Sequence, residues 1–519
     1  MRVFAALVAL LTLAAFAGAR AAPEEAPPAL TAQDTLALAI CEGVVELFEQ
    51  HPADMWPGYN LAKTPFIYYM PGKWTLLLNA SEPVAGFDPY PDKWPKIGTD
   101  ALFHAGPYEE LEGQIAFDVP VSDLQVAAIP FEAERPTIDR IALVLHENFH
   151  QYQYHEFGEI PWQREELYPI DDRENTALAF VEMRLLMGAI EAIKANDAAK
   201  CAARFKEFIA VRKERWNRSD PFVERFEQGQ ELEEGTAKYV EAKGIDLFAW
   251  LQYTSSVTAR AAWIVQTIPA VNLYDYLLDE FRARMNGNSI SPEDMPRNRI
   301  YAVASAQALV LDFFGIEWKS KAQTAGSQFT FAGLFQEHLE IERIEFPVLL
   351  QAAKDACGYG KVLAATDALI RDYRAGYAAE LKAFEDQTGY RFEIDLSSQN
   401  LRRSRSSTAR KWLVDRGATE LRNHFDVYTL QSAADETFLL QVKDTGVLER
   451  NAWAAKTKKI AFFVENAPAV TVDGAELDIK DGSAEFQTLE IAGDKLTLDC
   501  IRPGTIAKTG KKFVITLRP

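Results

Sequence analysis

The order of apolar and polar residues divides the chain into a mixed first part, a long helical middle and a strand-rich end. A helical pattern covers residues 31–50. Four segments then have the length and composition of strands: 66–70, 74–78, 113–119 and 124–129. Pro71-Gly72 separates the first two, as in a tight turn between paired strands. We therefore expect a small sheet over about residues 64–130.

Residues 138–391 have a mostly helical pattern. Helices are expected at 174–195, 197–226, 247–269, 301–314 and 347–388, the last with breaks at glycines. A further helix contains the apolar run 141–145, and we expect Thr137 to cap it and Gly158 to end it. With the preceding sheet, this predicts an α+β fold in which a mostly helical domain covers residues 31–395.

The composition changes after residue 395. Residues 396–412 are rich in serine and arginine and predict an exposed basic linker. Beyond it, short apolar runs alternate with turn signals at 438–442, 459–464, 470–474, 489–491, 496–501 and 512–517. We expect a small all-β domain over 413–519, with packing against the first domain favoured over binding of a partner.

Residues 146–150 form the pattern His-Glu-x-x-His inside the apolar helix. At 3.6 residues per turn, His146 and His150 lie on one face and can share one Zn²⁺. Glu147 is turned about 100° away, beside the position of a metal-bound water whose proton it can take. A chance pattern is the alternative, but a buried apolar helix does not carry these polar residues without a partner. The sequence therefore predicts a zinc site.

A catalytic zinc site needs a third protein ligand. His155 is the nearest candidate, but it lies nine residues after His146 and points to the opposite side of the helix. Two later segments place glutamates on predicted helices, one with Glu174 and one with Glu234. From the residues alone both glutamates remain candidates, and Glu234 is the better fit.

Residues 234–241 have the pattern Glu-Gly-x-Ala-x-Tyr-x-Glu. Downstream of His-Glu-x-x-His, this pattern resembles the gluzincin metallopeptidases, in particular their aminopeptidase-like branch. The resemblance implies that His146, His150 and Glu234 bind zinc. It also implies that Glu147 is the general base.

Other residues of this second motif have implied roles as well. The resemblance implies that Glu241 orients a ligand histidine. The small residues Gly235 and Ala237 are expected to let their helix approach the helix of the two histidines closely. The helices predicted over 174–226 are expected to form a hairpin that leaves the site and returns to it.

The predicted function is that of a zinc-dependent hydrolase, a metallopeptidase that acts on a peptide or protein substrate. Tyr301, at the start of a predicted helix, is a candidate donor to the oxyanion, and Tyr239 is an alternative donor. A non-catalytic, exported metal-binding or interaction protein on the same core is the alternative function. Glu147 favours the enzyme, because only catalysis requires its carboxylate.

Residues 1–22 have the charge, apolar stretch and small residues of a secretory signal peptide. The apolar stretch is too short to span a membrane, so we expect an exported protein, periplasmic or extracellular, without membrane insertion. The net charge of -20 disfavours nucleic acid as a partner. Four distant cysteines could form up to two disulfides in an oxidising compartment. The oligomeric state is not predicted.

Overall fold

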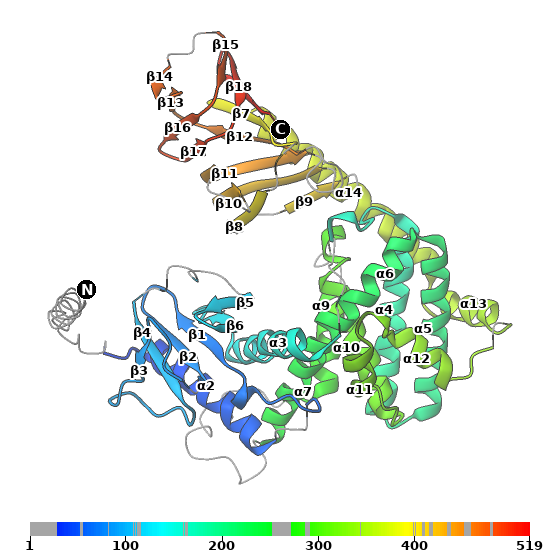
Figure 1. Cartoon of the computed structure of the whole chain (residues 1–519). Helices are drawn as coiled ribbons and strands as arrows, with labels where there is room; N and C mark the ends of the chain where they lie inside the picture. Colours follow the sequence, from blue (N-terminus) through cyan, green and yellow to red (C-terminus); the bar gives the residue numbers. More distant parts are fainter. Residues whose placement is uncertain are drawn as a thin grey trace, which may run out of the picture.

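The structure, a computed structural model, describes most of the chain between residues 29 and 518 (Figure 1). The segments outside this description are 1–28, 52–54, 81, 107, 109–110, 112–115, 159, 161–164, 252–270, 286–290, 343, 398, 400, 407–410, 415–418, 433–436, 451–457, 478–480 and 519. The predicted signal peptide and most of the helix predicted over 247–269 lie there. The described parts form an N-terminal sheet, a helical body and a C-terminal β region, which confirms the α+β class.

The N-terminal sheet is mixed, with strand order β3-β4-β2-β1-β6-β5. Its described strands are β1 (Phe66–Met70), β2 (Trp74–Leu78), β3 (Asp88–Pro89), β4 (Ala101–Ala105), β5 (Ala116–Val121) and β6 (Leu124–Pro130). β1 and β2 are the predicted antiparallel pair, and Gly72 supplies the positive φ of 72° in their turn. Before the sheet, the predicted helix α2 (Ala32–Gln50) begins at a capping box formed by Thr31 and Asp34.

Helix α3 (Thr137–Glu156) carries the metal motif in its middle and lies between the N-terminal sheet and the helical body (Figure 1). The prediction that Thr137 caps this helix is wrong. Pro136 is the N-cap residue, and its carbonyl oxygen accepts the first helical hydrogen bond, 3.0 Å from the backbone nitrogen of Arg140. The helix ends at Glu156, and its C-cap residue Phe157 directly precedes Gly158.

The chain then leaves α3 and returns to it. The helices of this excursion are η2 (Glu165–Leu167), α4 (Arg173–Lys194), α5 (Ala198–Arg218), α6 (Pro221–Gln230), the π-helical turn η3 (Glu231–Gly235) and α7 (Thr236–Leu251). α4 and α5 form the predicted hairpin. The helix predicted over 197–226 is divided, because Asp220 caps a new helix whose first residue is Pro221. α7 then packs against α3.

The remaining helices complete the body. They are η1 (Leu61–Lys63), α9 (Leu273–Met285), η4 (Pro292–Asp294), α10 (Asn298–Phe313), α11 (Lys319–Ala325), η5 (Gly326–Gln328), α12 (Phe331–His338), α13 (Phe346–Ala356) and α14 (Tyr359–Glu385). α10 packs against α4, α7 and η3. Gly358, at φ +61°, separates α13 from α14, as predicted for a break at a glycine. α14 leads to the C-terminal β region (Figure 1).

The C-terminal region is a sheet of thirteen described strands. They are β7 (Tyr390–Asp395), β8 (Leu401–Ser406), β9 (Lys411–Val414), β10 (Thr419–Ser432), β11 (Phe438–Arg450), β12 (Lys459–Val464), β13 (Ala469–Val472), β14 (Ala475–Glu476), β15 (Gly482–Phe486), β16 (Leu489–Gly493), β17 (Leu496–Cys500), β18 (Gly504–Thr509) and β19 (Lys512–Leu517). The main path is β14-β13-β16-β17-β11-β12-β7-β19-β18-β15, and β10 pairs with β11, β8 and β9.

Two predictions near residue 395 are wrong. β7 falls inside the range predicted for the first domain, but it pairs with β12 and β19 of the C-terminal sheet. β8 falls inside the predicted linker 396–412, but its residues pair with β10 from Val427 to Ser432. Strand pairing uses backbone groups, so a polar segment of serines and arginines can still join a sheet. The strands β10, β15 and β18 were not predicted.

Two further findings concern membrane-spanning helices and the cysteines. No helix in the described part of the chain is long and apolar enough to cross a membrane. Cys41, Cys201, Cys357 and Cys500 are all described, and each is a free thiol. The sequence allowed up to two disulfides among these four cysteines, and the structure has none among them.

The close approach predicted for Gly235 is made to a different helix. A Cβ atom added at Gly235 would lie 2.1 Å from Cβ of Ala304 on α10, so this glycine admits α10 rather than α3. The glycine of α7 that faces α3 is Gly244, where an added Cβ would lie 2.4 Å from Cδ1 of Leu145. Gly235 thus allows the close contact between η3 and α10.

Gly235→Ala is expected to lower the free energy of unfolding by about 1–3 kcal/mol, because Cβ of Ala304 is fixed to the backbone and cannot rotate away. Gly244→Ala should cost less, because the leucine methyl that it meets is the end of a flexible side chain. Gly188→Ala is the control, because a Cβ atom added at this position inside α4 would lie no closer than 3.6 Å to any neighbouring atom. This variant should not lower the free energy of unfolding. Urea unfolding of the three variants measures this, and equal stabilities would contradict the tight contact.

Candidate metal centre

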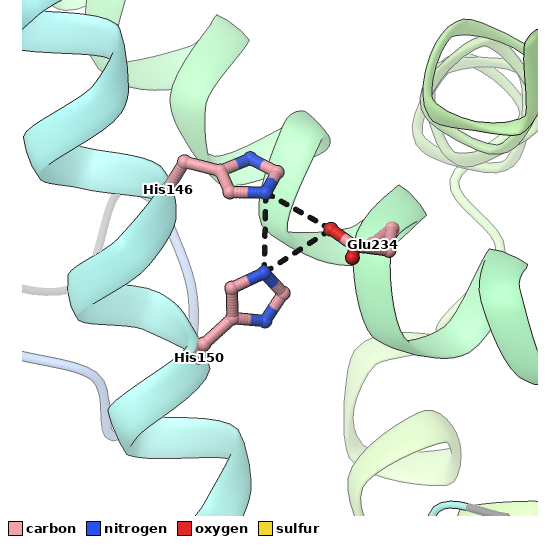
Figure 2. A group of neighbouring side chains, drawn as sticks. All are labelled: His146, His150 and Glu234. Atoms are coloured by element: carbon pink, nitrogen blue, oxygen red, sulfur yellow. Dashed lines mark hydrogen bonds and ion pairs between the residues drawn. The ribbon is translucent and has the colours of Figure 1, made fainter. Parts of the chain in front are cut away.

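His146 and His150 of α3 point toward Glu234 of η3 (Figure 2). Nε2 of each histidine lies 3.2 Å from Oε2 of Glu234, and the two Nε2 atoms lie 3.1 Å apart. All three side chains are buried. Of the two glutamates that the sequence left open, the structure therefore brings Glu234 to the histidines.

The three atoms fit one face of a tetrahedral zinc site. Bonds of about 2.0–2.1 Å at tetrahedral angles place neighbouring ligand atoms about 3.3–3.4 Å apart. The observed separations of 3.1–3.2 Å are slightly shorter. Within the described part of the chain, this is the one group of three histidine, cysteine or acidic side chains spaced to hold a metal ion. Two histidines and one glutamate leave a fourth position open for water or substrate.

Gln153 fixes the ring of His150 and was not singled out as a site residue from the sequence. Nδ1 of His150 donates to Oε1 of Gln153 over 2.7 Å, which directs Nε2 of the same ring toward Glu234. The amide nitrogen of Gln153 donates to the carbonyl oxygen of Glu233 at 2.8 Å and to Oγ1 of Thr236 at 2.7 Å. One side chain thus joins α3 to the turn that carries Glu234. The signal in the sequence is its position three residues after His150, on the same helical face.

Glu241 faces the other histidine, where the resemblance implied an orienting carboxylate. Its Oε2 lies 3.3 Å from Nδ1 of His146. Its Oε1 accepts hydrogen bonds of 2.5 Å from Nζ of Lys238 and from the hydroxyl of Tyr276. Lys238 also pairs with Glu280 at 3.0 Å. The carboxylate is therefore held from two sides while it faces the His146 ring.

The charges of the site shift the pKa values of its groups. Burial lowers the pKa of His146, but its interactions with Glu234 and Glu241 outweigh burial and raise it to about 9. Burial raises the pKa of Glu241, but Lys238 and His146 lower it to about 2. The pKa of Glu234 is also held well below its usual value, against burial, by His150 and His146. Both carboxylates are therefore negative at neutral pH, and His146 is protonated before metal binds.

Helix α10 and its N-cap residue Arg297 add two more groups to the site. The ring of Tyr301 stacks on the ring of His146, with centroids 5.5 Å apart and planes at 14°. Nε of Arg297 donates to the hydroxyl of Tyr301 at 3.1 Å, and its Nη2 donates to Oε1 of Glu234 at 3.0 Å. Burial and the charge of Glu234 raise the pKa of Tyr301 far above its usual value, so the hydroxyl keeps its proton. The sequence singled out Tyr301 but not Arg297.

Glu147 follows His146 on α3 and is partly exposed, unlike the two buried histidines. Glu234 and Glu147 are among the charges that raise the pKa of His150 against the effect of burial. The Glu147 carboxylate therefore lies within electrostatic reach of the second histidine.

Three residues considered from the sequence lie elsewhere. Glu174 on α4 pairs with Arg218 at 2.9 Å, and both side chains are about half exposed. The hydroxyl of Tyr239 donates to an aspartate of α10 at 2.5 Å. His155 lies on the other side of α3, as predicted, where its Nε2 is 2.9 Å from the Gln151 amide.

A cluster of six buried charges includes Glu231, the first residue of η3. Its members, here called the buried charge cluster, are Glu182, Arg212, Arg215, Glu227, Glu231 and Arg299. Arg212 donates to Glu231 at 2.5 Å and to Glu182 at 3.1 Å. Arg215 donates to Glu182 at 2.6 Å and to Glu227 at 2.8 Å. Three arginines thus balance three glutamates away from water.

Comparison with known proteins found no matching family model, curated protein or solved structure. The function of the chain is therefore inferred from the residues and geometry of the site.

Zinc affinity is expected to rise with pH between about 6.5 and 9, by about tenfold per pH unit for each proton released. His146 has a pKa of about 9 before metal binds, so its proton must leave before Nε2 can bind zinc. Titration calorimetry in buffers of different ionisation enthalpy counts the released protons. Glu174→Gln, far from the site, should give the same slope, and an affinity independent of pH would contradict the assignment of His146.

Proposed function

We propose that the protein is an exported zinc-dependent hydrolase, a metallopeptidase of the gluzincin type. The proposal is carried by the convergence of three ligand atoms from His146, His150 and Glu234 within 3.2 Å of one another. Glu147 lies next to the first of these residues on the same helix. Export is supported by the sequence of residues 1–22.

When bound, zinc polarises the scissile carbonyl and makes a water molecule a better nucleophile. Glu147 accepts the proton of the attacking water, since its partly exposed carboxylate can reach solvent beside the histidines. It then donates this proton to the leaving amine. Gln153 and Glu241 hold the rings of His150 and His146 so that both Nε2 atoms face the ligand position.

Tyr301 is the proposed donor to the oxyanion that develops during attack. Its hydroxyl is protonated, and its ring is held against His146. Arg297 binds that hydroxyl and adds a positive charge on the same side of Glu234. Preorganised donors of this kind stabilise negative charge at the reacting carbonyl.

A peptide substrate is supported by the edge of the N-terminal sheet. β5 is the last strand in the order of the described sheet, and α3 packs against both β5 and β6. An edge strand packed against the helix of the metal motif offers its backbone N–H and C=O groups to an extended peptide. The same sheet also supports α3, and that would be its sole role in a non-catalytic metal-binding protein.

Glu147→Gln is expected to lower kcat/KM by about 10²–10⁴-fold and to leave zinc bound, because it removes proton transfer without removing a ligand. A mixed library of fluorogenic peptides measures turnover, and mass spectrometry measures metal. Glu156→Gln, an exposed glutamate at the end of the same helix, is the matched control. Equal turnover in wild type and Glu147→Gln would refute the mechanism. Stoichiometric zinc without any turnover in wild type would favour the non-catalytic alternative.

A further inference from the structure

A cavity of about 280 Å³ opens beside the candidate metal centre. His150 lines one side of it, and Glu233, the neighbour of Glu234, lines another. The aromatic side chains of Tyr154 and Phe157 also line it, together with Ile160. A substrate side chain adjacent to the scissile bond could therefore enter this cavity while the bond itself lies at the metal centre.

The cavity combines an apolar wall with one acidic group. Gln153 also lines it, but the polar atoms of Gln153 are bound to His150 and to the backbone of η3. Among the described lining residues, Glu233 is the only acidic one. Arg297 is a cation close enough to influence Glu233, but its hydrogen bonds go to Glu234 and Tyr301.

We propose that this cavity is a specificity subsite for a lysine or arginine side chain of the substrate, with Glu233 as its recognition residue. The proposal rests on the proposed peptidase function and names its substrate class. The aliphatic stem of the basic side chain packs on Phe157 and Ile160, and its charged end pairs with the carboxylate of Glu233. Tyr154, which is 59% exposed, supplies a ring face for the cation at the rim.

The charge of the whole protein favours the same class of substrate. At a formal net charge of -20, the protein attracts cationic peptides over a longer range than the cavity itself can. Long-range attraction acts on any cationic peptide, whereas Glu233 selects the position of the basic residue relative to the scissile bond. A comparison of peptides with equal net charge separates the two effects.

The first test uses fluorogenic peptides that differ at the residues flanking the scissile bond. Each position carries arginine, its neutral isostere citrulline, norleucine or glutamate, and a distant lysine or glutamate keeps the net charge constant. Wild type should prefer arginine over citrulline at one flanking position by about ten- to one-hundredfold in kcat/KM, as expected for one charge-assisted hydrogen bond. Equal rates for arginine and citrulline at both positions would overturn the proposal.

Glu233→Gln should reduce the ratio of arginine to citrulline to near one, and Glu233→Lys should favour glutamate. Glu156→Gln, an exposed acidic residue on α3 outside the cavity lining, should keep the wild-type ratio. Because Glu233 precedes Glu234, zinc content is measured for each variant, and ratios are compared between proteins with full zinc. A Glu233→Gln variant that keeps the wild-type ratio would also overturn the proposal.

A binding measurement separates failure of this subsite from failure of the peptidase function. Saturation-transfer NMR compares arginine amide with citrulline amide on zinc-loaded wild type and Glu233→Gln. Preferential binding of arginine amide that depends on Glu233, without hydrolysis of any peptide, would reject the peptidase and keep the cationic site. Peptide hydrolysis without such a preference in rate or binding would reject the subsite and keep the peptidase.

Discussion

The placement of Glu234 depends on the pairing of charges that the fold removes from water. Isolated buried ions cost several kcal/mol each, and removal of one partner from a buried pair costs about 3–5 kcal/mol. In the buried charge cluster, arginines from α5 and α10 pair with glutamates from α4, α6 and η3. In the observed arrangement of these helices every charge of the cluster has a partner, and in this arrangement η3 directs Glu234 toward α3.

The contacts that orient the two histidines are also the contacts that join α3 to the second motif. Gln153 binds His150 with one end of its amide and the backbone of η3 with the other. Glu241 on α7 faces His146 and is held in turn by Lys238. A shift of α7 against α3 would therefore disturb the ligand atoms and the side chains behind them together. This coupling explains how residues 88 positions apart converge to 3.2 Å.

The parts of the site that follow a fixed spacing were predictable from the sequence. The histidines of α3 lie one helical turn apart, so their common face follows from helix geometry. The pattern Glu-Gly-x-Ala-x-Tyr-x-Glu over residues 234–241 indicated that Glu234, rather than Glu174, lies at the histidines. Gln153, Lys238 and Arg297 were missed, because their roles depend on which helices pack together.

In the fold as well, elements set by a local sequence pattern were predictable, and elements set by pairing between distant segments were not. β1, β2, β12 and β19 follow local apolar runs and lie where the pattern predicted them. β8 is rich in serine and arginine and joins the sheet through backbone pairing with β10, which composition does not reveal. The start of α3 was misplaced by one residue, because Pro136 takes the N-cap position without a side-chain hydrogen bond.

The most direct test of the metal centre is the zinc content of purified protein after equilibration with limiting zinc, measured by mass spectrometry. Wild type, Glu234→Gln and Glu174→Gln are compared, since Glu174 lies in the first turn of α4 and Glu234 in η3, directly before α7, but only Glu234 lies at the histidines. We predict one zinc per chain in wild type and Glu174→Gln, and much less than one in Glu234→Gln. Zinc retained in full by Glu234→Gln, or lost with Glu174→Gln, would contradict the assignment of Glu234 as the third ligand.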